Sequence, residues 1–220
     1  MRTLAVLPVK TFGAAKQRLS PALPVPERRS LAEAMVSDVL AALARVRALD
    51  AIAMVTAEEA ARAAALAAGC EVLDDTARDG QSPAALIGVR HALAEGFSRV
   101  LLVPGDTPLL DPAEVDALLE RGAGRTPGVT IVPDRHGTGT NALLLDPPDA
   151  IAPSFGPGSF ERHRQAAESA GANLLVDPAP SLVLDVDTGD DLGRLVEALQ
   201  ARPGGAPATR AALAPHRVSA

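Results

Sequence analysis

The chain of 220 residues is long enough for one α/β domain with a full hydrophobic core and short for two. A net charge of −6 without a Lys/Arg block argues against a nucleic-acid partner, and an aromatic content of 2% argues against base-stacking surfaces. The lone cysteine, Cys70, excludes a disulfide framework, and the N-terminal apolar run is too short for a signal peptide or membrane span, so a cytoplasmic location is expected.

Short apolar runs alternate with stretches of helical periodicity, which is the pattern of a parallel α/β sheet. The predicted strands cover residues 4–7, 51–56, 71–73, 100–103, 128–132, 142–145, 174–176 and 182–184. The predicted helices cover residues 27–46, 58–68, 83–93, 112–120 and 159–170, and a last helix ends at residue 200. We therefore predict a single-domain, Rossmann-like, three-layer α/β/α fold with a mostly parallel sheet over residues 1–200, and a flexible Pro/Ala/Gly-rich tail over residues 201–220.

A long basic loop follows the first predicted strand, over residues 9–20, and contains Lys10, Lys16 and Arg18. Lysine supplies a point charge and arginine a planar fork of donors, so this loop suits the phosphates of a nucleoside triphosphate. The alternative interpretation is that all three are solvated surface charges.

Gln81 and Ser82 lie directly before the helix that Pro83 is predicted to open. Their side chains are candidates for contacting the edge of a nucleotide base. For Ser82 taken alone, a helix cap is the simpler interpretation.

Asp106 is the first charged side chain beyond the apolar strand 100–103, which Pro104 and Gly105 end. Ligands bind at the carboxyl ends of the strands in open α/β sheets, and a carboxylate there suits a hard cation. The alternative is that Asp106 caps the helix that opens at Pro112.

Two glycine-rich segments in the second half are candidates for anion binding. Residues 133–141 are dense in Gly, Thr and Asn and include Thr140 and Asn141, whereas a plain hairpin turn needs only one or two such residues. Residues 154–160 include Gly156 and run into a predicted helix at Ser159, and a helix N-terminus binds phosphate or carboxylate well.

Asp185 and Asp187 follow the last predicted strand, and alternation places them on one face of an extended chain. Two carboxylates so close repel each other unless a cation lies between them. With Asp106 and the basic loop they indicate a site where cations hold a triphosphate and acids hold Mg²⁺, which stabilises charge as pyrophosphate leaves. Such chemistry needs no general base, because an acceptor phosphate is already a nucleophile.

Five segments, spread over residues 4–195, carry a family resemblance. They are PVK (8–10) with AKQRLS (15–20), PGDTPLL (104–110), DRHGTGTN (134–141), FGPGSF (155–160) and LDVDT (184–188). The chain resembles the 2-phospho-L-lactate / phosphoenolpyruvate guanylyltransferases of coenzyme F420 biosynthesis, within the molybdenum-cofactor guanylyltransferase-like superfamily. The GTGTN and FGPGSF sequences are the specific ones, since the first two segments would fit many nucleotidyltransferases.

The resemblance implies a nucleotide-diphospho-sugar transferase-like fold and a Mg-dependent enzyme that transfers GMP from GTP to a phosphorylated three-carbon acid, releasing pyrophosphate. It implies Asp106, Asp185 and Asp187 as Mg²⁺ ligands, Lys10, Lys16 and Arg18 as contacts of the GTP phosphates, and Thr140, Gly156 and Ser159 as contacts of the acceptor. Asn141 joins the substrate-binding candidates as a further donor. Family members often have Leu-Asn where this chain has Ser82-Pro83, so guanine selection is unexplained, with Gln81 and Ser82 as substitutes.

Several alternatives stay open on the sequence. The acceptor can be phosphoenolpyruvate, 2-phospho-L-lactate or 3-phospho-D-glycerate, or, outside this family, molybdopterin or a sugar phosphate. A non-catalytic nucleotide-binding domain is the alternative from another class, whereas a dehydrogenase is disfavoured because no G-x-G-x-x-G follows the first strand. A homodimer and hand-over of the product to a downstream transferase are compatible with the sequence, which does not determine the oligomeric state.

Overall fold

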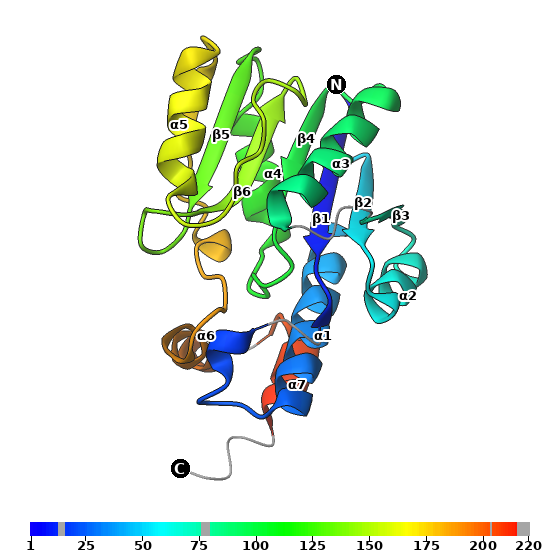
Figure 1. The fold of residues 1–220 in the computed structure, drawn as a ribbon, viewed down its shortest axis with the longest axis vertical. Coiled ribbons are helices and arrows are strands. Elements are labelled where there is room, and N and C mark those ends of the chain that lie inside the picture. Colours follow the sequence, from blue (N-terminus) through cyan, green and yellow to red (C-terminus); the bar gives the residue numbers. More distant parts are fainter. Residues whose placement is uncertain (13–15, 76–79, 203, 215–220) are drawn as a thin grey trace.

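A computed structural model describes residues 1–12, 16–75, 80–202 and 204–214 of the chain. Within these residues a seven-stranded sheet has the order β3-β2-β1-β4-β6-β5-β7 (Figure 1). The strands are β1 (Thr3–Val9), β2 (Ala51–Thr56), β3 (Glu71–Asp74), β4 (Arg99–Leu102), β5 (Gly128–Pro133), β6 (Thr140–Asp146) and β7 (Asn173–Val176). Only β6 runs against its neighbours β4 and β5 in this described sheet, so the prediction of a mostly parallel sheet is confirmed.

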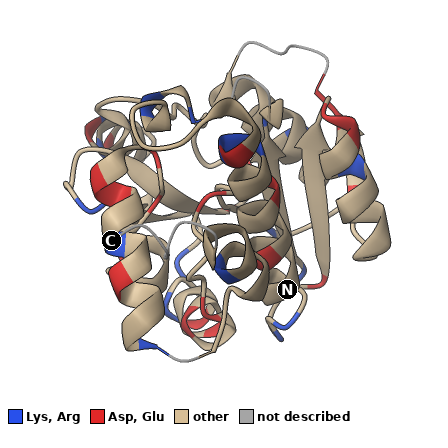
Figure 2. Cartoon of the chain, turned by 90° about the horizontal axis from the view of Figure 1, so that it is seen from below, with Lys and Arg blue, Asp and Glu red and all other residues tan. Residues whose placement is uncertain are grey.

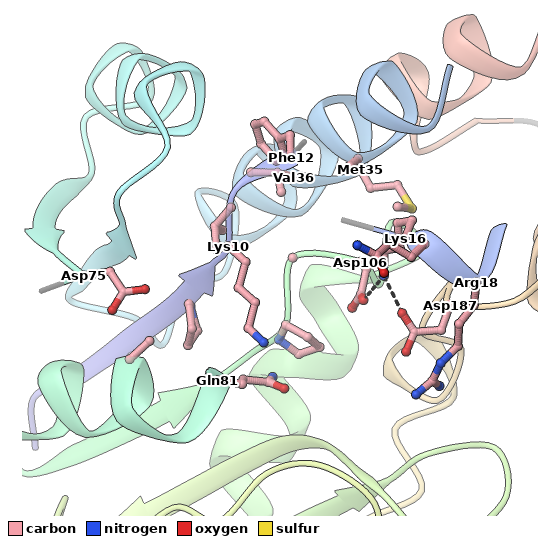
Figure 3. A pocket seen from close by; sticks show the side chains of 17 residues that line it. Lys10, Phe12, Lys16, Arg18, Met35, Val36, Asp75, Gln81, Asp106 and Asp187 are labelled. Atoms are coloured by element: carbon pink, nitrogen blue, oxygen red, sulfur yellow. Dashed lines mark hydrogen bonds and ion pairs between the residues drawn. The ribbon is translucent and has the colours of Figure 1, made fainter. Parts of the chain in front are cut away.

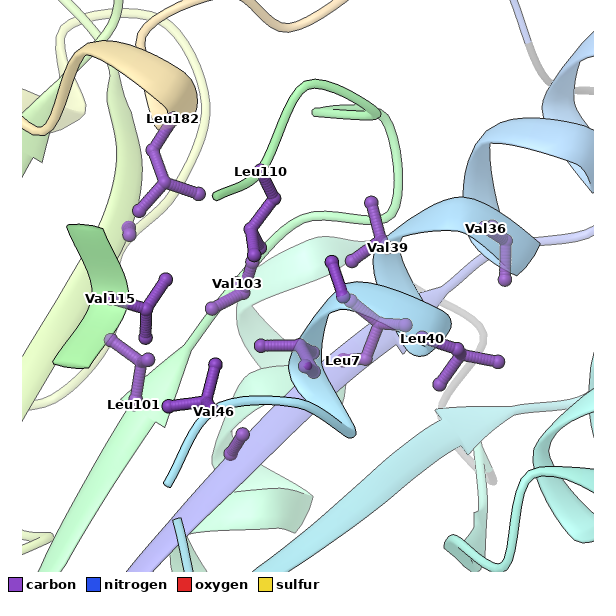
Figure 4. Close-up of a cluster of buried hydrophobic side chains, with 14 of the residues drawn as sticks. Leu7, Val36, Val39, Leu40, Val46, Leu101, Val103, Leu110, Val115 and Leu182 are labelled. Atoms are coloured by element: carbon purple, nitrogen blue, oxygen red, sulfur yellow. The ribbon is translucent and has the colours of Figure 1, made fainter. Parts of the chain in front are cut away.

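Helices cover both faces of the sheet. They are α1 (Val25–Leu43), α2 (Glu59–Ala67), α3 (Gln81–Ala94), α4 (Pro112–Arg121), α5 (Ser159–Ser169), α6 (Gly189–Ala201) and α7 (Pro207–Leu213), with 3₁₀ turns η2 (Gln17–Leu19) and η3 (Pro180–Leu182). The alternation of β1 explains the layers, because Leu7 packs with α1, α2 and α4 (Figure 4) while Val6 packs with α3 and α5 on the other face. The predicted three-layer α/β/α architecture is confirmed.

Helix α3 lies close to β1 because Gly88 has no side chain. A Cβ at this position would overlap the Cγ1 of Val6, a buried residue of the sheet. We expect Gly88→Ala to lower the free energy of unfolding by about 1–3 kcal/mol through overpacking. Gly193→Ala in α6 is the matched control, since its Cβ would meet nothing within 4 Å, and it is expected to be neutral or stabilising by up to about 1 kcal/mol. Urea unfolding measures the stability of both variants. Equal unfolding midpoints for Gly88→Ala and Gly193→Ala would contradict the close packing of α3 against β1.

The strand predicted over residues 182–184 is wrong. The segment turns through η3, and residues 183–187 belong to no strand of the described sheet. The apolar side chain of Leu182 is buried against the α4 face of the sheet, which accounts for the pattern that predicted a strand. The carbonyls of Leu182 and Val183 accept hydrogen bonds from the Asn141 side chain instead of from a neighbouring strand.

The predicted flexible tail is wrong for Pro207–Leu213, which forms helix α7 beside α1 (Figure 1). The buried carboxylate of Asp38 in α1 accepts the N–H groups of Ala208 (3.1 Å) and Thr209 (2.7 Å). This contact comes from a distant element, so local composition could not reveal it. Residues 203 and 215–220 of the predicted tail lie outside the described residues, as do Ala15 and residues 76–79 of the predicted loops.

The described surface carries both signs of charge. Figure 2 shows Lys and Arg interspersed with Asp and Glu along the helices. Many of these residues pair, for example Arg164 with Glu161 and Glu168 on α5. None of the described helices combines the length and the apolar character needed to cross a lipid bilayer.

Candidate functional site

A cleft of about 460 Å³ opens at the carboxyl ends of β1 and β4 (Figure 3). Its charged and amide lining comes from four places in the chain: Lys10, Lys16, Gln17 and Arg18 after β1, Asp75 after β3 with Gln81 at the start of α3, Asp106 after β4, and Asp187 before α6. The structure therefore brings the three predicted cations together with two of the three predicted acids, at the edge of the sheet where ligands bind in this class of fold.

The third acid, Asp185, completes a cluster with Asp106 and Asp187. One carboxylate oxygen from each of these residues lies within 4.8 Å of the other two. The backbone N–H of Val186 donates to the carbonyl of Asp106 (3.2 Å), which joins the turn after β4 to the late acidic segment. The convergence of three aspartates that the sequence analysis predicted is therefore present.

The cluster has the chemistry of a divalent-cation site. Asp106 Oδ1 is buried and has no hydrogen-bond partner among the described residues, as suits a metal ligand atom. Burial, together with the charges of Asp106 and Asp187, raises the pKa of Asp185 to about 6, against the opposing hydrogen bond from Asn141. A cation bound between these carboxylates would offset both effects, so the residues present fit a metal such as Mg²⁺.

The Lys16 ammonium lies between two of the acids. It donates to Asp187 Oδ1 (2.8 Å) and makes a short ion pair with Asp106 Oδ2. Burial by itself lowers the pKa of Lys16, but the two carboxylates outweigh it and hold the pKa above its usual value. Lys16 is therefore charged at the place where acidic side chains and a triphosphate would meet.

Asp106 does not cap the helix that follows it. That role belongs to Asp111, whose Oδ1 accepts the N–H of Ala113 (2.8 Å) at the start of α4. The side chain of Asp106 instead lines the cleft. The preceding residue, Gly105, allows the turn to lie against α1, because a Cβ on Gly105 would come 2.9 Å from Val36 Cγ2.

Asn141 holds the segment that carries Asp185 rather than lying in an open loop. It belongs to β6, which begins at Thr140. Its Nδ2 donates to the carbonyls of Leu182 and Val183 (both 2.9 Å) and to Asp185 Oδ1 (3.2 Å). These bonds hold Asp185 in place, and the contact of Asn141 with a substrate stays a prediction.

We expect Asn141→Leu to lower the free energy of unfolding by about 2–3 kcal/mol, because it leaves buried carbonyl groups without donors. Asn173→Leu is the matched control, since this exposed amide also donates to a backbone carbonyl, that of Pro127 (3.2 Å), and its loss is expected to cost less than about 1 kcal/mol. Urea unfolding compares the two. Equal losses would contradict the role of Asn141 as the anchor of this segment.

A second anchor, which the sequence analysis missed, holds Asp187. Asp191 Oδ2 accepts the backbone N–H groups of Asp187 (3.2 Å) and Thr188 (2.8 Å), and Arg135 Nε donates to Asp191 Oδ1 (2.7 Å). Thr188 and Asp191 form the capping box that starts α6. The spacing of Thr188 and Asp191 was the available sequence signal, whereas Arg135 comes from another element.

The predicted acceptor contacts lie at the N-terminus of α5 and on β6. Ser159 is the first residue of α5, and Gly156, with φ 105°, belongs to the loop before it, which Arg162 holds. The Arg162 guanidinium donates to the carbonyls of residues 154–157 (2.5–3.4 Å). Among the described residues, the N–H groups of Gly156 and Gly158 donate to no protein acceptor, so two backbone donors are available for an anion.

Gln81 and Ser82 lie inside α3, which begins at Gln81 with Gly80 as its N-cap. The helix-cap interpretation of Ser82 is therefore wrong, because the helix starts earlier than Pro83 suggested. Ser82 Oγ accepts the N–H of Phe155 (2.8 Å) and so contacts the loop of residues 154–158, whereas Gln81 lines the cleft near Lys10 (Figure 3). Contact of either residue with a base stays a prediction.

A model of the family described as "Guanylyl transferase CofC like" matches residues 3–199. The chain belongs to this family. Over 213 residues it is 49% identical to a phosphoenolpyruvate guanylyltransferase of Conexibacter woesei, covering 97% of this chain and 96% of that protein. It is also 36% identical to a 2-phospho-L-lactate guanylyltransferase of Methanothermobacter thermautotrophicus, covering 89% of this chain and 85% of the relative.

Solved structures support the fold of this family member. A protein from Desulfovibrio desulfuricans G20, classed with the nucleotide-diphospho-sugar transferases, superposes with a TM-score of 0.79 at 18% identity, covering 99% of this chain and 96% of that one. A nucleotidyl transferase from Methanothermobacter thermautotrophicus has a TM-score of 0.62 at 20% identity, covering 91% and 99%. The predicted nucleotide-diphospho-sugar transferase-like fold is confirmed.

Proposed function

We propose that this chain is a guanylyltransferase that transfers GMP from GTP to phosphoenolpyruvate or 2-phospho-L-lactate and releases pyrophosphate, in coenzyme F420 biosynthesis. The observation that carries the proposal is the meeting of Asp106, Asp185 and Asp187 beside a cleft lined by basic side chains. The family to which the chain belongs and the names of its relatives support the same activity.

In the proposed reaction an oxygen of the acceptor's phosphate attacks the α-phosphorus of GTP. The bond from this phosphorus to the oxygen that bridges to the β-phosphorus breaks, and pyrophosphate leaves with the electron pair. Lys10, Lys16 and Arg18 line the cleft and would neutralise the charge of the triphosphate. No side chain needs to remove a proton, because the phosphate nucleophile is already ionised, so positioning and charge account for the rate.

The three aspartates would hold Mg²⁺, whose contribution when bound is to neutralise phosphate charge. The protein's own part is to hold these carboxylates in place. Asn141 positions Asp185, and Asp191 holds the backbone of Asp187. These two contacts hold the negatively charged carboxylates of Asp185 and Asp187 close together despite their mutual repulsion.

We place the acceptor against the end of α5, where its phosphate and carboxylate would meet the N–H of Gly156, Ser159 at the start of the helix, and the hydroxyl of Thr140. These groups supply hydrogen-bond donors, which suit an acceptor that carries only anionic oxygens. Phosphoenolpyruvate is the first choice, because the relative that is 49% identical carries that name.

Incubation of the protein with GTP, Mg²⁺ and single acceptors tests the proposal. The panel contains phosphoenolpyruvate, 2-phospho-L-lactate, 3-phospho-D-glycerate, molybdopterin and a sugar phosphate, with pyrophosphate release and the product mass as readouts. We expect a guanosine-diphospho adduct of phosphoenolpyruvate or 2-phospho-L-lactate, and its loss when Mg²⁺ is chelated. A product formed only with molybdopterin or with the sugar phosphate would contradict the acceptor assignment. If none of the acceptors in the panel gives pyrophosphate release, the transferase activity is contradicted.

A further inference from the structure

His163 is a buried titratable side chain that the proposed reaction does not use. It lies on α5 and is fully shielded from solvent. Its Nε2 lies 2.8 Å from the backbone nitrogen of Ser154, and its Nδ1 lies 3.0 Å from Thr140 Oγ1. The imidazole thus connects the acceptor loop to strand β6, and it also contacts the edge of the Phe155 ring.

These two contacts determine which ring nitrogen carries the proton. A backbone N–H can only donate, so Nε2 must accept from Ser154 and cannot itself be protonated. In the neutral ring the proton is then on Nδ1, which donates to Thr140 Oγ1. Burial and the nearby Arg162 charge lower the pKa of His163 to about 4, in agreement with a neutral ring.

The tautomer in turn determines what Thr140 offers to a ligand. When its oxygen accepts from His163, the hydroxyl hydrogen is free to donate to another group. With the other tautomer, the hydroxyl would donate to Nδ1 and present only lone pairs, which repel an anion. The Thr140 hydroxyl then adds a donor to the N–H groups of Gly156 and Gly158, which donate to no acceptor among the described residues.

We propose that His163 is a positioning residue of the acceptor site, which makes the Thr140 hydroxyl a hydrogen-bond donor and ties residues 154–158 to β6. The inference rests on the proposed function for the identity of the ligand, a phosphorylated carboxylic acid. It makes His163 responsible for affinity toward that acceptor and not toward GTP, whose predicted contacts Lys10, Lys16 and Arg18 line the cleft, a lining to which neither His163 nor Thr140 belongs.

The tautomer can be observed without any enzymatic activity. Long-range ¹H–¹⁵N correlation spectra of the full chain, with the His163 signal assigned by its loss in His163→Asn, are expected to show a neutral ring protonated on Nδ1 at pH 6 to 7. A ring protonated on Nε2, or a doubly protonated ring, would overturn the inference. The variant His163→Asn serves only to assign the signal. The protonation pattern itself is read from the wild-type spectrum.

Kinetics separate a positioning role from a general structural one. His163→Leu removes both hydrogen bonds and is expected to raise the KM for the acceptor by about tenfold or more, with the KM for GTP changed by less than about twofold. His163→Asn retains an amide near the position of Nδ1 and is expected to recover part of this loss. His91→Leu is the control, because this histidine lies on α3 and pairs with Glu71, away from both sites, and neither KM should change.

A double-variant cycle with Thr140→Val tests whether His163 acts through the hydroxyl. We expect His163→Leu to have less effect in the Thr140→Val background than in the wild type. Fully additive effects, or equal increases in both KM values, would overturn the inference. If the wild-type protein turns over none of the acceptors, that result counts against the proposed function, while the NMR spectrum still decides the state of His163.

Discussion

Asp106→Asn is expected to lower turnover by about 100- to 1,000-fold or more, measured as pyrophosphate release at saturating GTP, acceptor and Mg²⁺. A neutral amide binds a divalent cation far less well than a carboxylate does, and Asp106 belongs both to the aspartate cluster and to the cleft lining. The buried Oδ1 without a protein partner is the atom whose charge would be lost or displaced.

Asp111→Asn is the matched control for this experiment. It makes the same chemical change in the same connection between β4 and α4, but at a residue that caps α4 and does not line the cleft. Because asparagine caps a helix about as well as aspartate does, we expect near-normal turnover and stability. Near-normal turnover in Asp106→Asn would remove this residue from the catalytic site, and a similar loss in both variants would indicate damage to the loop.

Lys16→Met is expected to have two opposite effects. The ammonium forms ion pairs with Asp106 and Asp187, so a divalent cation has to compete with it for the same carboxylates. Without Lys16, Mn²⁺ should bind the nucleotide-free protein more tightly, by about tenfold. Turnover should nevertheless fall by about 100-fold or more, because a cation that faces the triphosphate is lost.

Titration calorimetry with Mn²⁺ and the pyrophosphate assay measure these two effects. Lys10→Met serves as the comparison, since Lys10 also lines the cleft but makes no ion pair with the aspartates among the described contacts. It is expected to lower turnover without tightening Mn²⁺ binding. Unchanged Mn²⁺ affinity in Lys16→Met would show that the ammonium does not compete with the metal.

The positions of the three aspartates illustrate how far the sequence predicts the site. Asp106 is the first charged residue after an apolar run, and the ends of parallel strands meet at one edge of a sheet, so it could be placed there from the pattern alone. Asp185 and Asp187 were also predicted correctly at this edge, although the strand expected before them is absent. The position of Asp185 depends instead on the side chain of Asn141, a contact between segments far apart in the chain, and that of Asp187 on Asp191.

The sequence by itself determined the features that depend on neighbouring residues: the apolar runs that become strands, the acids and cations that follow them, and the family motifs. The tertiary structure alone decided which groups share hydrogen bonds, since Asn141, His163, Arg135 and Asp38 all act on partners in other elements. Helix α7 exists where composition predicted a flexible tail, because Asp38 satisfies the N–H groups at its start. The physical reason is that a polar side chain has no local periodicity that reveals its partner, and only the folded chain brings donor and acceptor together.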